Sequence, residues 1–243
     1  MKGAERYSVG VWLVKWWVRY QIWRQFHAVL LEDKSGVEWK NCRESVILCL
    51  NHTNWWDGFI ALFLSERHLG YPMWLMQEEE HLERYGFFRK LGVFGVERRN
   101  GIGALGGIRK TLRVLQRERQ AICIFPQGKL CHPDEKISCM RGVPWLQEKS
   151  GVSAIPVWLQ MEWFVESRPT ILIRLGKPLA PGANAEDLSE AMEGLRLKAP
   201  DLSVIEKMFP LQKPGRSINK YVDWFYYRVL KREKVRPIGR WNL

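Results

Sequence analysis

A histidine and an aspartate lie five residues apart in the stretch LNHTNWWDGF, at His52 and Asp57. A histidine can take a proton from a hydroxyl, and a neighbouring carboxylate can hold the imidazole in the tautomer that this step needs. In a continuous helix, residues five apart point about 140° away from each other, and in a strand they face opposite sides. A direct contact between the two side chains therefore requires a turn.

The residues around this pair predict such a turn. An apolar run ends at Asn51, and Asn54 and Asp57 are residue types that favour the beginning of a helix. We expect a strand, a turn and a helix in that order, with His52 near the amino end of the helix. The pair alone has a simpler interpretation, in which the histidine is an exposed loop residue and the aspartate only caps the helix.

Three further short patterns follow along the chain. They are GVFGVER at 92–98, IFPQGKL at 124–130 and AIPVW at 154–158. With the Asn-His-x4-Asp pattern of the first stretch, they resemble the four sequence blocks of the glycerolipid acyltransferases typified by lysophosphatidic acid acyltransferase. The resemblance covers residues 45–160 and implies an α/β sheet with a surface-bound, N-terminal helical motif.

The resemblance implies a role for each matching residue. His52 corresponds to the general base and Asp57 to the residue that orients it. Arg98 stands where the family binds the phosphate of the acceptor, and Arg99 is the adjacent alternative. The chemistry implied is transfer of a fatty acyl group from acyl-CoA or acyl carrier protein to a lysophospholipid-like hydroxyl, with no metal or redox cofactor.

The third block departs from the family pattern Phe-Pro-Glu-Gly-Thr-Arg. Gln127 replaces the usual glutamate, and Lys129 and Leu130 replace the threonine and the arginine. A glutamine is neutral and offers a donor and an acceptor, whereas a glutamate accepts charge-assisted hydrogen bonds. The end of the site that binds the acceptor is therefore expected to differ from that of a lysophosphatidic acid enzyme. The substrate-binding residues predicted from this block are Pro126, Gln127, Gly128 and Lys129.

Two other functions stay open at this point. The acceptor can lack a phosphate, as a glycolipid, a glycosylated carotenoid or an amino-acid lipid does. The protein can also be a non-catalytic module that binds membranes. In the catalytic interpretation, backbone N–H groups near Gly128 are expected to hold the oxyanion of the tetrahedral intermediate.

Short apolar runs bounded by turn residues predict the strands that position these blocks. They cover 45–51, 71–77, 121–126, 152–160 and 170–176. Helix candidates cover 57–68, 79–91, 103–118, 142–150, 185–198 and 217–234. Strands that alternate with helices predict a single α/β domain with a mixed central sheet flanked by helices, whose site lies at the carboxyl ends of the strands.

The segment from Val9 to Leu31 is predicted to form a tryptophan-rich helix. Lys15, Arg19 and Arg24 interrupt its apolar runs, which are much shorter than the ~18 residues of a membrane-spanning helix. Aromatic and basic residues together suit a helix that lies in the membrane surface. The alternative is an amphipathic helix packed on the protein's own core.

Composition supports a membrane surface as the partner. The chain has a formal net charge of +12 and 13 tryptophans among 243 residues. Positive charge favours an anionic partner, and tryptophan favours a boundary between apolar and wet regions over nucleic acid. Five scattered cysteines and no signal peptide favour a reducing setting. We expect a peripheral or monotopic protein on the cytoplasmic face of a membrane, with residues 1–35 as a membrane-surface segment and residues 36–243 as a catalytic domain with a C-terminal helical extension.

One basic stretch has no place in this assignment. RKTLRVLQRER, at 109–119, carries five Arg or Lys residues on one predicted helix. Such a face is most often simply solvated. The alternative is that it binds phosphate head groups or the phosphates of coenzyme A.

Overall fold

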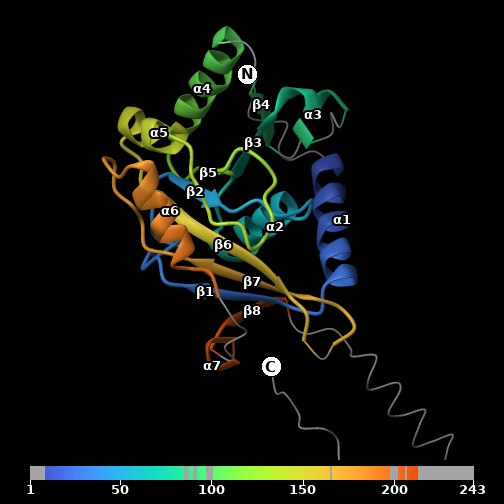
Figure 1. Ribbon diagram of the computed structural model, residues 1–243. Helices are drawn as coiled ribbons and strands as arrows, with labels where there is room; N and C mark the ends of the chain where they lie inside the picture. The colour runs from blue at the N-terminus through green and yellow to red at the C-terminus, as the bar shows by residue number, and fades with distance from the viewer. Residues whose placement is uncertain are drawn as a thin grey trace, which may run out of the picture.

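The computed structural model describes residues 9–84, 88–89, 92–96, 101–164, 166–197, 202–205 and 207–212. The described strands form one mixed sheet in the order β4-β3-β5-β2-β6-β7-β1-β8 (Figure 1). The strands are β1 (Val29–Asp33), β2 (Val46–Leu50), β3 (Met73–Glu78), β4 (Val93–Val96), β5 (Ala121–Ile124), β6 (Ala154–Glu162), β7 (Thr170–Leu175) and β8 (Phe209–Gln212). The helices are α1 (Val9–Gln25), α2 (Asp57–Leu64) with the π-helical η2 (Ser65–Leu69), α3 (Glu79–Arg84), α4 (Gly101–Leu115), α5 (Gly142–Ser150), α6 (Ala185–Glu193) and α7 (Leu202–Ile205).

Strand direction brings the predicted blocks to one edge of the sheet. Strands β4, β3, β5, β2 and β6 run parallel to one another, so their carboxyl ends share an edge, which we call the carboxyl edge. Strand β7 runs antiparallel to β6, and β1 runs parallel to β7. The end of β1 at Asp33 therefore lies at the opposite edge.

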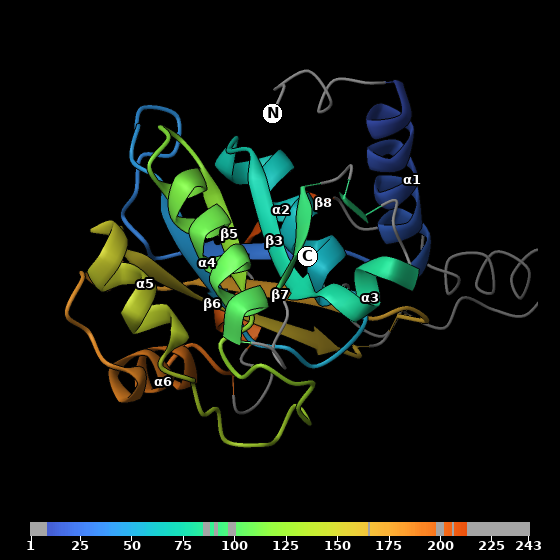
Figure 2. The ribbon, with the colours of Figure 1, turned by 90° about the horizontal axis from the view of Figure 1, so that it is seen from above.

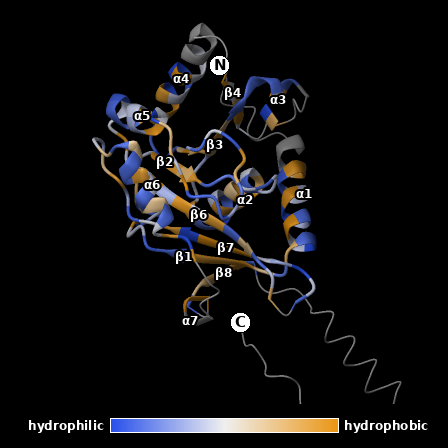
Figure 3. Cartoon of the chain, in the orientation of Figure 1, coloured by the Kyte–Doolittle hydropathy of each residue, from blue (hydrophilic) through white to orange (hydrophobic). Residues whose placement is uncertain are grey.

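Helices cover both faces of the sheet, which explains why the central strands are apolar throughout. Every residue of β2 and β7 is buried, as expected for strands covered on both sides. On one face, a core joins α1 and α2 to the sheet and includes Ile22, Phe26, Leu48, Phe59 and Leu64. On the other face, a core joins α4, α5 and α6 to it and includes Val114, Ile122, Leu146, Leu188 and Met192. Figure 2 shows these layers from above, and in Figure 3 the hydrophilic colour dominates α5 and α6 on the outside.

The predicted strands are confirmed, and three strands were missed. The five apolar runs correspond to β2, β3, β5, β6 and β7. The missed strands are β1, β4 and β8, which are short and lie in the outer part of the strand order. The helix candidate at 217–234 and parts of the one at 79–91 lie outside the described residues.

The prediction of one helix from Val9 to Leu31 is wrong at its carboxyl end. The helix ends at Gln25, and Val29–Leu31 pair with Ile171–Ile173 in β7. This Val-Leu-Leu run is fully buried in the sheet. Pairing with a distant strand therefore overrides the local apolar pattern, which a helix would satisfy equally well.

Helix α1 has two apolar sides. One side packs on the core through Val18 and Ile22, and Trp17 meets the ring of Phe59 in α2 at 6.1 Å between centroids. The other side is exposed and carries Trp12, Leu13, Trp16, Tyr20 and Trp23. Arg19 pairs with Glu66 of η2. The core-packed and the exposed interpretations of this segment thus each describe one side of α1. None of the helices in the described part of the chain is long and apolar enough to cross a bilayer.

Candidate active site

The predicted turn lies between β2 and α2 and begins at Asn51. This side chain is buried, donates to the carbonyl of Leu159 at 2.8 Å and accepts from the Leu159 N–H at 2.7 Å. These two bonds extend the pairing of β2 with β6 by one residue after the strand has ended. The chain is therefore fixed to the sheet immediately before His52.

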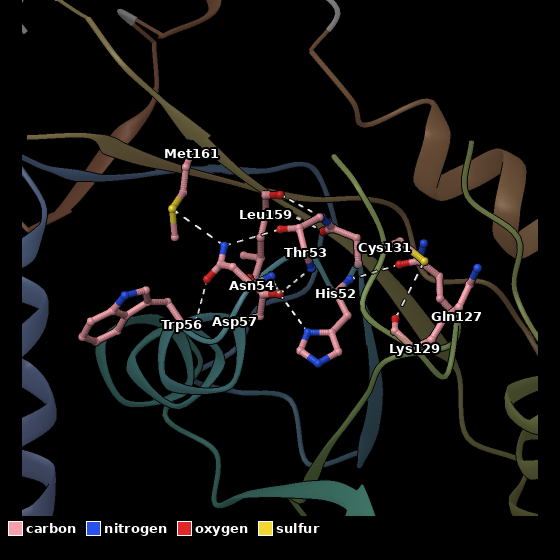
Figure 4. Close-up of polar contacts among 11 residues, drawn as sticks. His52, Thr53, Asn54, Trp56, Asp57, Gln127, Lys129, Cys131, Leu159 and Met161 are labelled. Atoms are coloured by element: carbon pink, nitrogen blue, oxygen red, sulfur yellow. Dashed lines mark hydrogen bonds and ion pairs between the residues drawn. The ribbon is translucent and has the colours of Figure 1, made fainter. Parts of the chain in front are cut away.

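The turn brings the histidine and the aspartate into direct contact, as their spacing required. His52 Nδ1 lies 2.9 Å from Asp57 Oδ2, and the same oxygen accepts from the N–H groups of Thr53 and Asn54 at 2.6 and 2.9 Å (Figure 4). Helix α2 begins at Asp57 after Trp56 as its N-cap, so neither Asn54 nor Asp57 takes the cap position itself. Asn54 instead closes the turn, because its Oδ1 accepts from the Trp56 N–H at 2.7 Å.

Burial differs sharply between the two members of the pair. The side chain of Asp57 is 1% exposed, whereas that of His52 is 26% exposed. Within the described residues, His52 Nε2 has no hydrogen-bond partner, and one face of its ring stacks on Phe125 with centroids 4.1 Å apart. The carboxylate therefore orients the ring through Nδ1, and Nε2 faces outward, where it can exchange a proton with a reactant.

Residues 33–160 match the family model described as Acyltransferase. The chain belongs to the acyltransferase family. The fold agrees with this, since the acyltransferase resembles the crystal structure of the 1-acyl-sn-glycerophosphate acyltransferase PlsC from Thermotoga maritima with a TM-score of 0.52 and 19% identity. That similarity covers 77% of this chain and 80% of PlsC. No curated protein matches the chain.

The third block of the acyltransferase and the residue that follows it hold the main chain of the histidine from both sides. Gln127 Oε1 accepts from the His52 N–H at 3.1 Å, and the N–H of Cys131 donates to the His52 carbonyl at 2.9 Å. The oxygen of Gln127 is thus directed at the backbone of His52. The amide nitrogen of Gln127 is therefore the atom of this side chain that remains to contact a substrate.

The other residues predicted from this block have partners inside the loop. The carbonyl of Pro126 accepts from the Met140 N–H at 2.8 Å, and the Gly128 N–H donates to Phe125 at 3.0 Å. Gly128 has a φ of 68°, a conformation that favours glycine. Its own N–H closes this turn, so an oxyanion contact would have to come from another group nearby.

Lys129 points to its own loop. Its ammonium group lies 3.2 Å from Glu135 Oε1, and hydrogen bonding to Glu135 raises the pKa of the lysine. The side chain is 68% exposed. Arg98 and Arg99, the predicted phosphate-binding residues, lie outside the described residues.

The two tryptophans beside the pair have separate environments. Trp56 packs on Phe26 and Phe59, with centroids 5.4 and 5.7 Å away, so it joins the core beneath α1. Trp55 is 58% exposed, although its ring reaches Phe59 and Phe88 at its inner edge. Of these two tryptophans, Trp55 is therefore the one that extends towards solvent.

The residues that support the pair were harder to predict than the pair itself. Leu159 and Cys131 act through main-chain groups, so their side chains give no signal in the sequence. Cys123 is fully buried on β5, and burial, followed by the negative charge of Asp57, raises the pKa of its thiol. That thiol stays protonated, and no group of three His, Cys, Asp or Glu side chains suited to a metal ion occurs in the described part of the chain.

Proposed function

We propose that this acyltransferase transfers a fatty acyl group from a thioester to the hydroxyl of a lysophospholipid-like lipid at a membrane surface. The observation that supports it best is the contact between His52 Nδ1 and Asp57, which leaves Nε2 facing outward. The thioester is acyl-CoA or acyl carrier protein. We expect no metal or redox cofactor, because acyl transfer from a thioester to an alcohol changes no oxidation state and His52 can carry the proton.

In the proposed reaction, His52 Nε2 takes the proton of the acceptor hydroxyl while its oxygen attacks the thioester carbonyl. Asp57 accepts a hydrogen bond from Nδ1–H and stabilises the imidazolium that forms. The tetrahedral intermediate then breaks its carbon–sulfur bond, and the leaving thiolate receives the proton from Nε2. The ester, the free thiol and neutral His52 result, so the residue returns to its starting state.

The N–H groups of Thr53 and Asn54 suit Asp57 to this role. Both donate to the oxygen that contacts His52, at 2.6 and 2.9 Å. The carboxylate also begins helix α2, where a negative charge is favourable. Asp57 is therefore a rigid positioning residue, and the reacting proton passes through His52 alone.

The acceptor is the least constrained part of this proposal. Arg98 or Arg99 would bind a phosphate if the acceptor is a lysophospholipid. A second candidate acceptor lacks a phosphate, and one observation favours it: the cation of the third block, Lys129, pairs with Glu135. A glycolipid, a glycosylated carotenoid or an amino-acid lipid would fit an acceptor site without that cation.

The exposed side of α1 supports attachment to the membrane from the cytoplasmic face as a peripheral or monotopic protein. Trp12, Trp16 and Trp23 are each more than half exposed there. Tryptophan is favoured at the level of lipid head groups, and the positive net charge adds attraction to an anionic leaflet. The alternative, a membrane module without catalysis, shares this surface but gives no role to the His52–Asp57 contact.

The catalytic proposal is tested by mass spectrometry of reaction products. Wild-type protein and a His52→Ala variant are each incubated with detergent-dispersed lipid extract and labelled acyl-CoA or acyl carrier protein. A labelled lipid made by the wild type and lost in the variant supports acyl transfer and identifies the acceptor. If neither protein labels any lipid from either donor and both still bind liposomes, the module without catalysis is the better description.

The membrane proposal has its own test. A W12S/W16S variant is expected to lose most of its flotation with anionic liposomes, because it removes two exposed aromatic rings from α1. W145S is the matched control, since it removes an exposed tryptophan from α5 on the other face of the sheet. Equal flotation of W12S/W16S and W145S would contradict a contact through α1.

A further inference from the structure

The outer face of α4 carries a continuous row of cations. Arg109, Lys110 and Arg113 are exposed on the helix, and Arg117 is exposed in the turn that follows it. Their spacing places them on one side, opposite the buried Gly107, Thr111 and Val114. We call these four residues the α4 cationic stripe.

Nothing in α4 itself balances this charge. The sequence of α4, GIGALGGIRKTLRVL, contains no acidic residue, and no described acidic side chain forms an ion pair with the stripe. Arg109 and Arg113, and then Arg113 and Arg117, stand four residues apart, where like charges destabilise a helix. The helix dipole favours cations at the carboxyl end, which explains Arg113 and Arg117, and Lys110 lies over the ring of Phe94, but neither reason applies to Arg109.

The basic residues around the stripe add little to its charge. Lys110 lies over the ring of Phe94 at 5.0 Å, and its pKa is lowered by burial and then by the charge of Arg89. Arg89 itself is neutralised by Glu79. The fifth basic residue of the predicted stretch, Arg119, has a structural role, since its guanidinium group binds the carbonyls of Trp39 and Lys40 at the opposite edge of the sheet.

The stripe runs away from the active site. Helix α4 follows β4 and precedes β5 in two parallel strands, so it begins at the carboxyl edge and runs back across the sheet. At 1.5 Å per residue, Arg109 lies about 12 Å along the helix from Gly101 and Arg113 about 6 Å further, and Arg117 follows the end of the helix at Leu115. An anionic group on the stripe is therefore far from His52, and its bearer has to reach the site with an extended arm.

The shape and the position of the stripe select a protein as the occupant. Small anionic ligands bind in concave sites, whereas Arg109, Lys110 and Arg113 lie on the convex face of a helix, and Arg117 alone borders a hollow, beside Arg43 and Ser45. The α4 and α1 helices cover opposite faces of the sheet, as Figures 1 and 2 both show, so a flat bilayer under α1 does not also face the stripe. A row of cations along one side of a helix matches an acidic helix on the surface of a protein.

We infer that the α4 cationic stripe is the docking surface for an acidic carrier protein that bears the acyl thioester on a flexible arm. This inference rests on the proposed function and selects the carrier protein as the donor. The arm extends from the stripe past the amino end of α4 to the carboxyl edge, where His52 receives the thioester. Charge complementarity there accelerates association and falls with ionic strength.

The test measures binding separately from turnover. The probe is a fluorescently labelled acyl carrier protein, titrated with wild type, with R109Q/R113Q/R117Q and with K40Q/K149Q/K177Q, which removes the same charge from exposed lysines elsewhere. The inference expects the stripe variant to bind at least tenfold more weakly than the wild type at low salt, and the control variant to remain close to the wild type. Transfer from palmitoyl-CoA is expected to be the same in all three proteins.

Three other outcomes overturn the inference. Equal weakening in both variants means that only net charge attracts the carrier, and no change in the stripe variant places the carrier elsewhere. A selective loss of transfer from palmitoyl-CoA assigns the stripe to the phosphates of coenzyme A. If the binding pattern holds while no protein transfers an acyl group from either donor, the docking surface stands and the proposed function fails.

Discussion

Two partly buried histidine–aspartate pairs of the described residues lie at opposite edges of the sheet, and a third pair, His132–Asp134, is exposed on a loop. At the carboxyl edge, His52 Nδ1 lies 2.9 Å from Asp57 Oδ2. At the other edge, His68 Nε2 lies 2.6 Å from Asp33 Oδ2. Residue types and distances are nearly the same, so what separates the pair proposed to react from the structural one has to lie in ring orientation and surroundings.

Ring orientation is the first difference. Nε2 is the nitrogen farther from the backbone, and in His52 it is free to meet a reactant, whereas in His68 it is the one bound to Asp33. Asp33 also accepts from Ser35 and from Trp39 Nε1, at 2.6 and 2.7 Å, so it fastens η2 to the end of β1 and the loop that follows. The second pair thus links distant segments, and the first presents an open nitrogen.

Removing each histidine gives the largest predicted contrast. His52→Ala is expected to lower kcat by a factor on the order of 10² to 10⁴, the usual contribution of a general base, and to leave the fold intact. His68→Ala is expected to retain kcat and to lower the free energy of unfolding by about 1–3 kcal/mol, because it removes a hydrogen bond to a carboxylate. Acyl-transfer kinetics and urea denaturation of both variants check this, and an equal loss of activity in both would contradict the distinction.

Asparagine in place of each aspartate gives the next contrast. Asp57→Asn keeps the shape of the side chain but removes the charge that stabilises an imidazolium, so we expect kcat to fall by a factor on the order of 10². The KM values are expected to change little, since Asp57 contacts His52 and not the substrate. Asp33→Asn serves as the control in the same assay, and a comparable fall in kcat there would mean that Asp57 acts only through stability.

The sequence predicted the contact between His52 and Asp57 and its turn, but not the second pair. His52 and Asp57 are five residues apart, so local geometry defines what must happen between them. Asp33 and His68 are 35 residues apart and meet only because β1 joins the sheet, and β1 itself was read as part of a helix. Contacts that depend on the pairing of distant strands leave no periodic signal in a single chain.

The third block shows the same limit at the level of one side chain. Gln127 was predicted to bind substrate because the family pattern has a glutamate there. The structure directs its oxygen to the His52 N–H, a main-chain partner that residue type cannot reveal. The apolar runs predict where the strands before His52 and before Gln127 end. Whether Gln127 contacts a substrate or the backbone depends on distances of a few ångströms, which the runs do not predict.

Acid titration tests the structural role of Asp33 through stability. Burial alone would raise the pKa of Asp33, but hydrogen bonds from His68, Ser35 and Trp39 outweigh it and lower that pKa from 3.8 to about 2. Because the folded pKa is lower, the stabilisation is complete above pH ~4 and is lost as the pH falls from about 4 towards 2, by about 2 kcal/mol in total. Unfolding free energies at pH 5 and pH 2.5 should differ less in Asp33→Asn than in the wild type. The exposed Asp134 supplies a control, Asp134→Asn, which should follow the wild type.

The smallest effect concerns how the main chain of each histidine is held. His68 lies in η2, whose own hydrogen bonds fix it, whereas His52 lies in a turn and relies on Gln127 and the Cys131 N–H. Gln127→Leu leaves the His52 N–H without its acceptor, so we expect a loss of about 1 kcal/mol in transition-state stabilisation, or roughly fivefold in kcat/KM. Gln127→Glu keeps an acceptor oxygen in the same place and is expected to retain more activity than Gln127→Leu. If the two variants are equally impaired, the neutral amide is needed for a contact with substrate. If both match the wild type, the Cys131 N–H is sufficient to hold the main chain of His52. Ring orientation is then the main difference between the two pairs.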